Sequence, residues 1–129
     1  MSENTDRYEN AVARYFEAWN AGEPEALAKA VAAAWSVEGT YTDPLAAVTG
    51  HTEIAGLITG AHAQFPGFAF RPLGSVDGHH ETARFAWELV SEADGTAPVA
   101  GFDVITLDAD GRIRSVLGFL DRVPAGATG

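Results

Sequence analysis

The sequence predicts an α+β domain in which three N-terminal helices pack inside a curved, mainly antiparallel sheet, forming a cone-shaped α+β barrel. In the N-terminal half, large apolar residues recur at steps of three and four, which is the period of a helix. In the C-terminal half, apolar and polar residues alternate, which is the period of a strand. Helices segregated from an antiparallel sheet cover one of its faces, and a curved sheet over them leaves a cone that is open at one end.

Three segments carry the helical period. The first covers residues 8–19, where the large apolar side chains share one face, and Gly22, which follows the helical stop, is able to take a left-handed cap conformation. The second covers residues 24–35, begins with a proline and is rich in alanine. The third covers residues 51–65 and ends before Pro66-Gly67.

Five further segments are expected to be strands. A short one, residues 39–43, precedes the third helix, and four longer antiparallel strands follow that helix. Asp77-Gly78, Asp94-Gly95 and Asp110-Gly111 are turn signals between the longer strands, and the last is the strongest hairpin signal in the chain. No repeat or linker divides the sequence, so residues 1–129 are expected to form a single domain.

The charge balance excludes several classes of partner. The chain has 129 residues and a formal net charge of -10, from 18 acidic residues against 8 Lys and Arg. Nucleic acids and anionic membrane surfaces need clustered cations, so neither is an expected partner, whereas a mostly apolar small molecule fits better. The absence of cysteine excludes disulfides and thiol nucleophiles. The polar start MSENTDRYEN and the lack of a long apolar run favour a cytoplasmic protein.

Two acids stand out by their positions. Asp43 ends the first strand directly before Pro44, so it is either a turn former or a rigidly held base. Asp103 alternates with apolar residues on the inward face of its strand, where an ionised carboxylate is costly. Burial there is expected to raise the pKa of Asp103 and to keep its carboxyl group neutral.

The order of the elements and three phrases resemble a known superfamily. The phrases YFEAWNAGEPEAL, YTDPL…GHTEI and GFDVITLDADGRI are similar to the nuclear transport factor 2-like proteins, and within them to the SnoaL-like and ketosteroid-isomerase-like branches. The resemblance covers residues from about 8 to about 122 and implies the cone-shaped fold. Since this fold hosts enzymes, binding proteins and scaffolds, the activity has to be argued from the site.

The resemblance to the ketosteroid isomerases implies roles for three residues. Tyr15, which follows an arginine and precedes Asn-Ala-Gly, matches the tyrosine that donates to the oxyanion, and Asp43 matches the general base. Asp103, eight residues before Gly111, matches a protonated aspartate that is the second donor. Such a base removes a proton next to a carbonyl group, and the two donors stabilise the enolate oxygen that develops.

Two positions depart from these relatives. A supporting tyrosine on the third helix of the isomerases falls near Ile58, which is aliphatic. A histidine of the SnoaL cyclases has no counterpart in the inward run Phe85, Trp87 and Leu89. The leading hypothesis is a cofactor-independent enzyme that moves protons on a hydrophobic carbonyl compound, by isomerisation or cyclisation. The alternatives are a non-catalytic small-molecule-binding protein with the same pocket, and a dimeric interaction protein whose pocket is vestigial.

Other residues are expected around the ligand, although each also suits an ordinary core. They are Trp19, Trp35, Ile58, Phe85, Trp87, Ile105, Val116 and Leu120. No metal or cofactor is expected, because His79 and His80 point to opposite faces of a strand and no third ligand stands at metal spacing. A homodimer is expected, because sheets of this superfamily commonly pair and RSVLGFLDRV carries apolar residues on both faces.

Overall fold

Three helices pack against one six-stranded sheet in the computed structural model, which describes residues 2–123. This confirms the predicted α+β class. None of the described helices is long and apolar enough to cross a membrane. In chain order, the elements are α1 (Ser2–Asn20), α2 (Pro24–Ala34), β1 (Trp35–Thr42), β2 (Ala47–Thr49), α3 (His51–Gln64), β3 (Phe68–His79), β4 (Thr82–Ser91), β5 (Val99–Leu107) and β6 (Ile113–Arg122).

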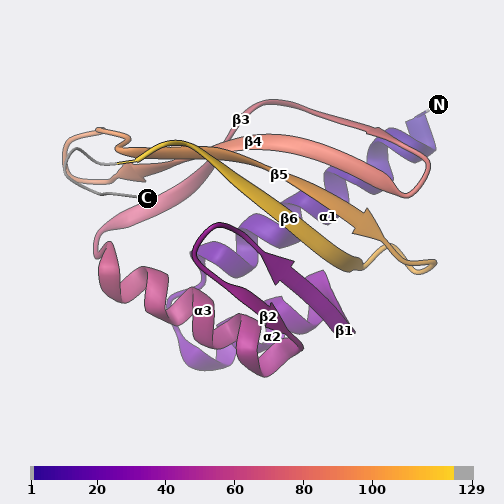
Figure 1. The fold of residues 1–129 in the computed structure, drawn as a ribbon, viewed down its shortest axis with the longest axis horizontal. Helices are drawn as coiled ribbons and strands as arrows, with labels where there is room; N and C mark the ends of the chain where they lie inside the picture. The colour runs from indigo at the N-terminus through magenta and orange to yellow at the C-terminus, as the bar shows by residue number, and fades with distance from the viewer. Residues whose placement is uncertain (1, 124–129) are drawn as a thin grey trace.

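The sheet is mixed and open. Its strand order is β2-β1-β6-β5-β4-β3, in which β1 and β6 run parallel and the other neighbours are antiparallel. Within the described residues, the edge strands β2 and β3 do not pair with each other, so the sheet curves without closing into a complete barrel. In Figure 1, β3 to β6 arch over the helices, and β1 and β2 lie below β6, beside α3.

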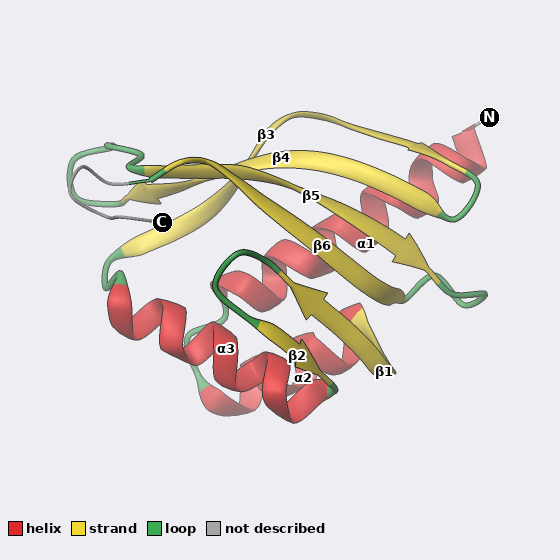
Figure 2. Ribbon diagram, viewed as in Figure 1, coloured by secondary structure: helices red, strands yellow, loops and turns green. Residues whose placement is uncertain are grey.

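The core lies between α1 and the concave face of the sheet. Figure 2 shows α1 passing behind the arch of strands, with α2 and α3 below it. The inward residues that the helical period predicts on α1 are buried, as are the inward residues of β4. Tyr15 and Phe16 both meet the ring of Phe85, with ring centroids 5.2 and 5.5 Å apart. Burial of this aromatic surface anchors α1 against the sheet.

The prediction of a turn at Asp77-Gly78 is wrong. Strand β3 continues to His79, and the chain turns at His80, which has a positive φ of 51°. Gly78 serves a different purpose, because a Cβ atom there would lie 2.6 Å from the ring of Tyr8. The Tyr8 hydroxyl donates to the main-chain oxygen of His80 over 2.8 Å. Close approach of α1 to β3 therefore accounts for this glycine.

The predicted end of the second helix is also corrected. Trp35 does not continue α2 but begins β1, with extended backbone angles (φ -109°, ψ 146°) and a pairing to Ile113 on β6. Pairing with a neighbouring strand overrides the helical period at this residue. The three-residue strand β2 was not predicted, and it forms a hairpin with β1 whose turn begins at Asp43.

Candidate active site

A cavity of about 730 Å³ lies between the concave face of the sheet and helices α1 and α3. This volume is typical of small-molecule sites, and the wall is mostly apolar and aromatic. Tyr15, Asp43 and Asp103, the three predicted catalytic residues, all border it. The full lining comprises Tyr15, Phe16, Trp19, Tyr41, Asp43, Leu45, Gly56, Leu57, Gly60, Ala61, Gln64, Phe65, Phe70, Trp87, Leu89, Val99, Asp103, Leu120 and Val123.

Asp103 lies at the buried end of this cavity, with 1% of its surface exposed. The Tyr15 hydroxyl donates to its Oδ2 over 2.5 Å, and the indole N–H of Trp87 donates to its Oδ1 over 3.2 Å. Strand pairing places Gly118 opposite Asp103, where a Cβ atom would lie 2.9 Å from Oδ1 and 3.3 Å from the Cβ of Asp43. The bare backbone of Gly118 therefore leaves room for both acids.

Burial controls the protonation of Asp103 and Tyr15. It raises the pKa of Asp103 from 3.8 to about 6, against the hydrogen bonds from Tyr15 and Trp87, which lower it. The negative charge of Asp43 raises the same pKa further. Burial, followed by the charge of Asp103, raises the pKa of Tyr15 well above its ordinary value. Tyr15 thus stays a neutral donor, while Asp103 gains a proton just below neutral pH.

Asp43 closes the hairpin between β1 and β2, and it also faces the cavity. Its Oδ1 accepts hydrogen bonds from the main-chain N–H groups of Leu45 and Ala46, over 2.8 and 2.9 Å. Its Oδ2 accepts from the Tyr41 hydroxyl over 2.7 Å. Each carboxylate oxygen has two lone pairs, so Oδ2 keeps one for a ligand. The two sequence readings of Asp43, as a turn former and as a rigidly held acid, are therefore compatible.

Tyr41 is a site residue that sequence reasoning missed. It is buried, it borders the cavity, and burial raises the pKa of its hydroxyl strongly, followed by the charges of Asp103 and Asp43. Strand alternation contained the signal, because Tyr41 stands two residues before Asp43 and so shares its face. The site accordingly holds two acids, each bonded to its own tyrosine.

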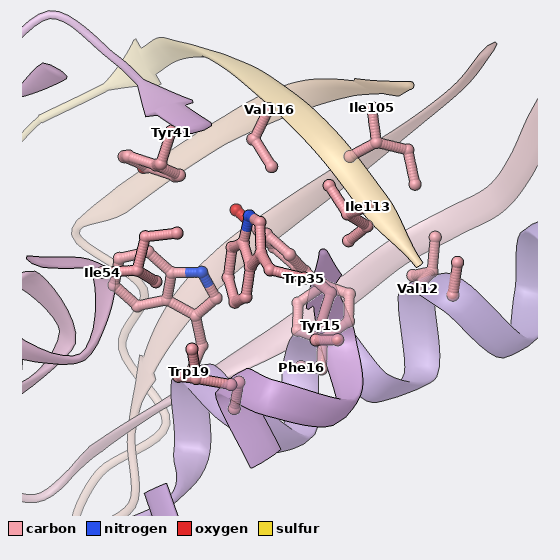
Figure 3. Close-up of a cluster of buried hydrophobic side chains, with 14 of the residues drawn as sticks. Val12, Tyr15, Phe16, Trp19, Trp35, Tyr41, Ile54, Ile105, Ile113 and Val116 are labelled. Atoms are coloured by element: carbon pink, nitrogen blue, oxygen red, sulfur yellow. The ribbon is translucent and has the colours of Figure 1, made fainter. Parts of the chain in front are cut away.

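The predicted lining residues divide into two groups. Trp19, Trp87 and Leu120 border the cavity. The others lie in the packed core and do not border it, although all are buried, and Figure 3 shows several of them in one cluster with Tyr15. This core group consists of Trp35, Ile58, Phe85, Ile105 and Val116.

The fold and the site together define a class of protein: an open α+β cone that encloses an apolar cavity with a buried acid at its inner end. The chain belongs to the SnoaL-like domain family, whose profile matches residues 12–116. The resemblance seen in the sequence is thereby confirmed.

Individual relatives agree with this assignment. A steroid Delta-isomerase of Nocardioides simplex is 36% identical over 115 residues, which cover 84% of this chain and 85% of that protein. A solved candidate isomerase of the SnoaL-like family from Agrobacterium tumefaciens str. C58 is 38% identical, with a TM-score of 0.85 over 90% of this chain and 98% of that one. A candidate polyketide cyclase from Sinorhizobium meliloti is 19% identical, with a TM-score of 0.66 over 84% and 93% of the two chains, and shows the fold alone.

Proposed function

We propose that this protein is a cofactor-independent isomerase that moves a proton on a hydrophobic carbonyl compound. The observation that carries the proposal is the meeting of Asp43 with the Tyr15–Asp103 pair at one apolar cavity. The 36% identity to a protein named steroid Delta-isomerase supports the same class of chemistry.

Asp43 is the proposed base. Its Oδ2 takes a proton from a carbon next to the carbonyl group, and the electrons of that C–H bond form the enolate, whose charge gathers on oxygen. The Asp43 carboxyl group exchanges its proton with water and then returns a proton either to the same carbon or to a carbon further along the conjugated system. The second return moves the double bond, and either return restores the carboxylate. No atom is gained or lost, so the reaction is an isomerisation.

Tyr15 and Asp103 are the proposed donors to the enolate oxygen, and Tyr15 takes this role by turning its hydroxyl hydrogen from Asp103 to that oxygen. A neutral Asp103 carboxyl group donates a hydrogen bond, and its pKa of about 6 makes that form accessible near neutral pH. An anionic oxygen beside it favours the proton further, because like charges repel. Buried donors of this kind act most strongly where water is excluded.

Isomerisation is favoured over cyclisation by the inward face of β4. Phe85, Trp87 and Leu89 occupy this face. The strand therefore has no counterpart of the histidine that the resemblance to the SnoaL cyclases implies. The second candidate is a non-catalytic binding protein with the same cavity. The hairpin turn that Asp43 closes favours it, since that turn explains this acid without any chemistry.

Proton exchange tests the proposal directly. A cyclic β,γ-unsaturated ketone incubated with the protein in deuterated water should gain deuterium next to its carbonyl and convert to the conjugated isomer. Asp43→Asn should abolish both reactions but bind a naphtholate more tightly, because it removes a negative charge near the bound anion. Asp121→Asn, an exposed acid on β6 outside the cavity lining, is the matched control. Binding without exchange in the wild type would identify a binding protein instead.

A further inference from the structure

Two buried indole N–H groups in the described part of the chain have no hydrogen-bond acceptor. They belong to Trp19 and Trp35. A buried donor without an acceptor carries a desolvation cost, so each calls for an explanation. The two differ in position, because Trp19 borders the cavity and Trp35 lies in the packed core.

Trp19 is held firmly at the cavity wall. It lies one turn after Tyr15 on α1, 6% exposed, with its ring centroid 5.5 Å from Tyr41 and 4.9 Å from Phe70. Its main-chain oxygen lies 2.7 Å from Nε2 of His62 on α3. The indole N–H is close enough to the Tyr15 hydroxyl to oppose the rise of the Tyr15 pKa, although it makes no hydrogen bond of good geometry.

The other buried donors at the cavity are already occupied. Within residues 6–123, four buried side chains other than the acids carry a polar hydrogen and border it: Tyr15, Trp19, Tyr41 and Trp87. Tyr15 and Trp87 donate to Asp103, and Tyr41 donates to Asp43. Trp19 is the member of this set whose hydrogen has no acceptor.

We propose that the Trp19 indole N–H donates a hydrogen bond to the ligand oxygen that binds beside the Tyr15 hydroxyl. Where the proposed function holds, on which this step rests, that oxygen is the carbonyl oxygen of the substrate and then the enolate oxygen. Trp19 can reach it without breaking the Tyr15–Asp103 hydrogen bond. The ligand class is a hydrophobic compound with one strongly accepting oxygen at its buried end.

The test compares two ligands and two matched variants. A naphtholate supplies an anionic oxygen, and naphthalene supplies the same rings without it. Trp19→Phe should weaken naphtholate binding about tenfold or more and leave naphthalene binding nearly unchanged, because a hydrogen bond to a charged group is lost. Trp35→Phe removes an equally unpartnered N–H outside the cavity and should alter the two affinities alike. Equal losses for both ligands in Trp19→Phe would overturn the proposal.

The indole N–H resonances in the NMR spectrum of the wild type give a second measurement, which does not depend on whether a variant folds. Naphtholate should move the Nε1–H resonance of Trp19 downfield, while naphthalene should not. An unmoved resonance at saturating naphtholate would also overturn the proposal. The exchange assay separates this result from the proposed function. Exchange without a Trp19 effect rejects the donor alone, and a Trp19 effect without exchange rejects the isomerase alone.

Discussion

The hydroxyl group of Tyr41, near the end of β1, donates to the carboxylate of Asp43, the first residue after that strand, over 2.7 Å. The main-chain N–H groups of Leu45 and Ala46 hold the other carboxylate oxygen. The proposed base is thus oriented by the strand before it and by the turn in which it lies. Its geometry depends mainly on about six consecutive residues rather than on distant packing.

The first prediction concerns this orientation. Tyr41→Phe keeps the ring and removes the hydroxyl, which leaves Asp43 Oδ2 free to turn away from the substrate. We expect kcat to fall roughly tenfold with little change in KM, because misplacing a reacting group penalises the chemical step. Tyr8→Phe is the matched control, since Tyr8 is a buried tyrosine of α1 whose hydroxyl donates to the main-chain oxygen of His80, in the turn after β3. A change confined to KM, or equal losses in both variants, would contradict the positioning role.

The second prediction concerns the stability cost of Asp103. Its pKa is 3.8 ordinarily and about 6 in the folded protein, so between these values the folded state holds a proton that the unfolded state has lost. The contribution of Asp103 to the free energy of unfolding therefore falls as pH rises through this window, by about 3 kcal/mol in total.

Urea titrations of the wild type and Asp103→Asn isolate this contribution. The free energy of unfolding of the variant, minus that of the wild type, should be larger at about pH 7.5 than at about pH 4. The reason is that the variant has no carboxylate charge to bury at the higher pH. Other titrating groups are common to both proteins and largely cancel. A stability difference that is the same at both pH values would place the Asp103 pKa near its ordinary value.

Local patterns in the sequence were enough to single out the helices, most of the sheet and the two acids. Asp43 is marked by the proline after it, and Asp103 by its place in an apolar alternation. The same patterns could not separate Trp35 and Phe85 from Trp19, since core and cavity residues both point inward. Which inward side chains border the cavity depends on how the helices stand against the sheet, and that spacing is set by contacts distant in sequence.

The third prediction is a homodimer, which we propose forms through an outer patch made of Phe102, Val104, Leu117 and Phe119. These residues pair across β5 and β6 on the face opposite Asp103. The rings of Phe102 and Phe119 stack with centroids 4.9 Å apart, and Leu117 and Phe119 are each 48% exposed. A contiguous exposed apolar patch of this kind is typical of an interaction surface.

Sedimentation at micromolar concentration measures the assembly. The wild type should sediment as twice the 13.6 kDa chain, and Phe119→Glu should sediment as a single chain, because a charge in a buried interface is costly. Val37→Glu places the same charge on β1, at a residue that is 64% exposed outside the patch, and should stay dimeric. A wild type that sediments only as a single chain would reject the dimer.

The last prediction concerns the width of the cavity. Gly56 and Gly60 stand four residues apart in α3, and both border the cavity. A Cβ atom at either position would meet no heavy atom within 4 Å outside the helix's own backbone. Each glycine costs an α-helix roughly 1 kcal/mol relative to alanine. The cavity is therefore wide beside α3 at the expense of helix stability.

Substitutions at Gly60 should therefore stabilise α3 and reduce the size of the ligand that the cavity accepts. Gly60→Ala should raise the free energy of unfolding by up to about 1 kcal/mol and weaken naphtholate binding slightly. Gly60→Leu should weaken naphtholate binding by about tenfold or more, while a one-ring phenolate binds almost as before, because only the larger ligand reaches α3. Calorimetric titration of both ligands against the three proteins decides the point. Equal losses of affinity for the two ligands would mean that the substitution disturbs the site around Asp103 rather than the α3 side of the cavity.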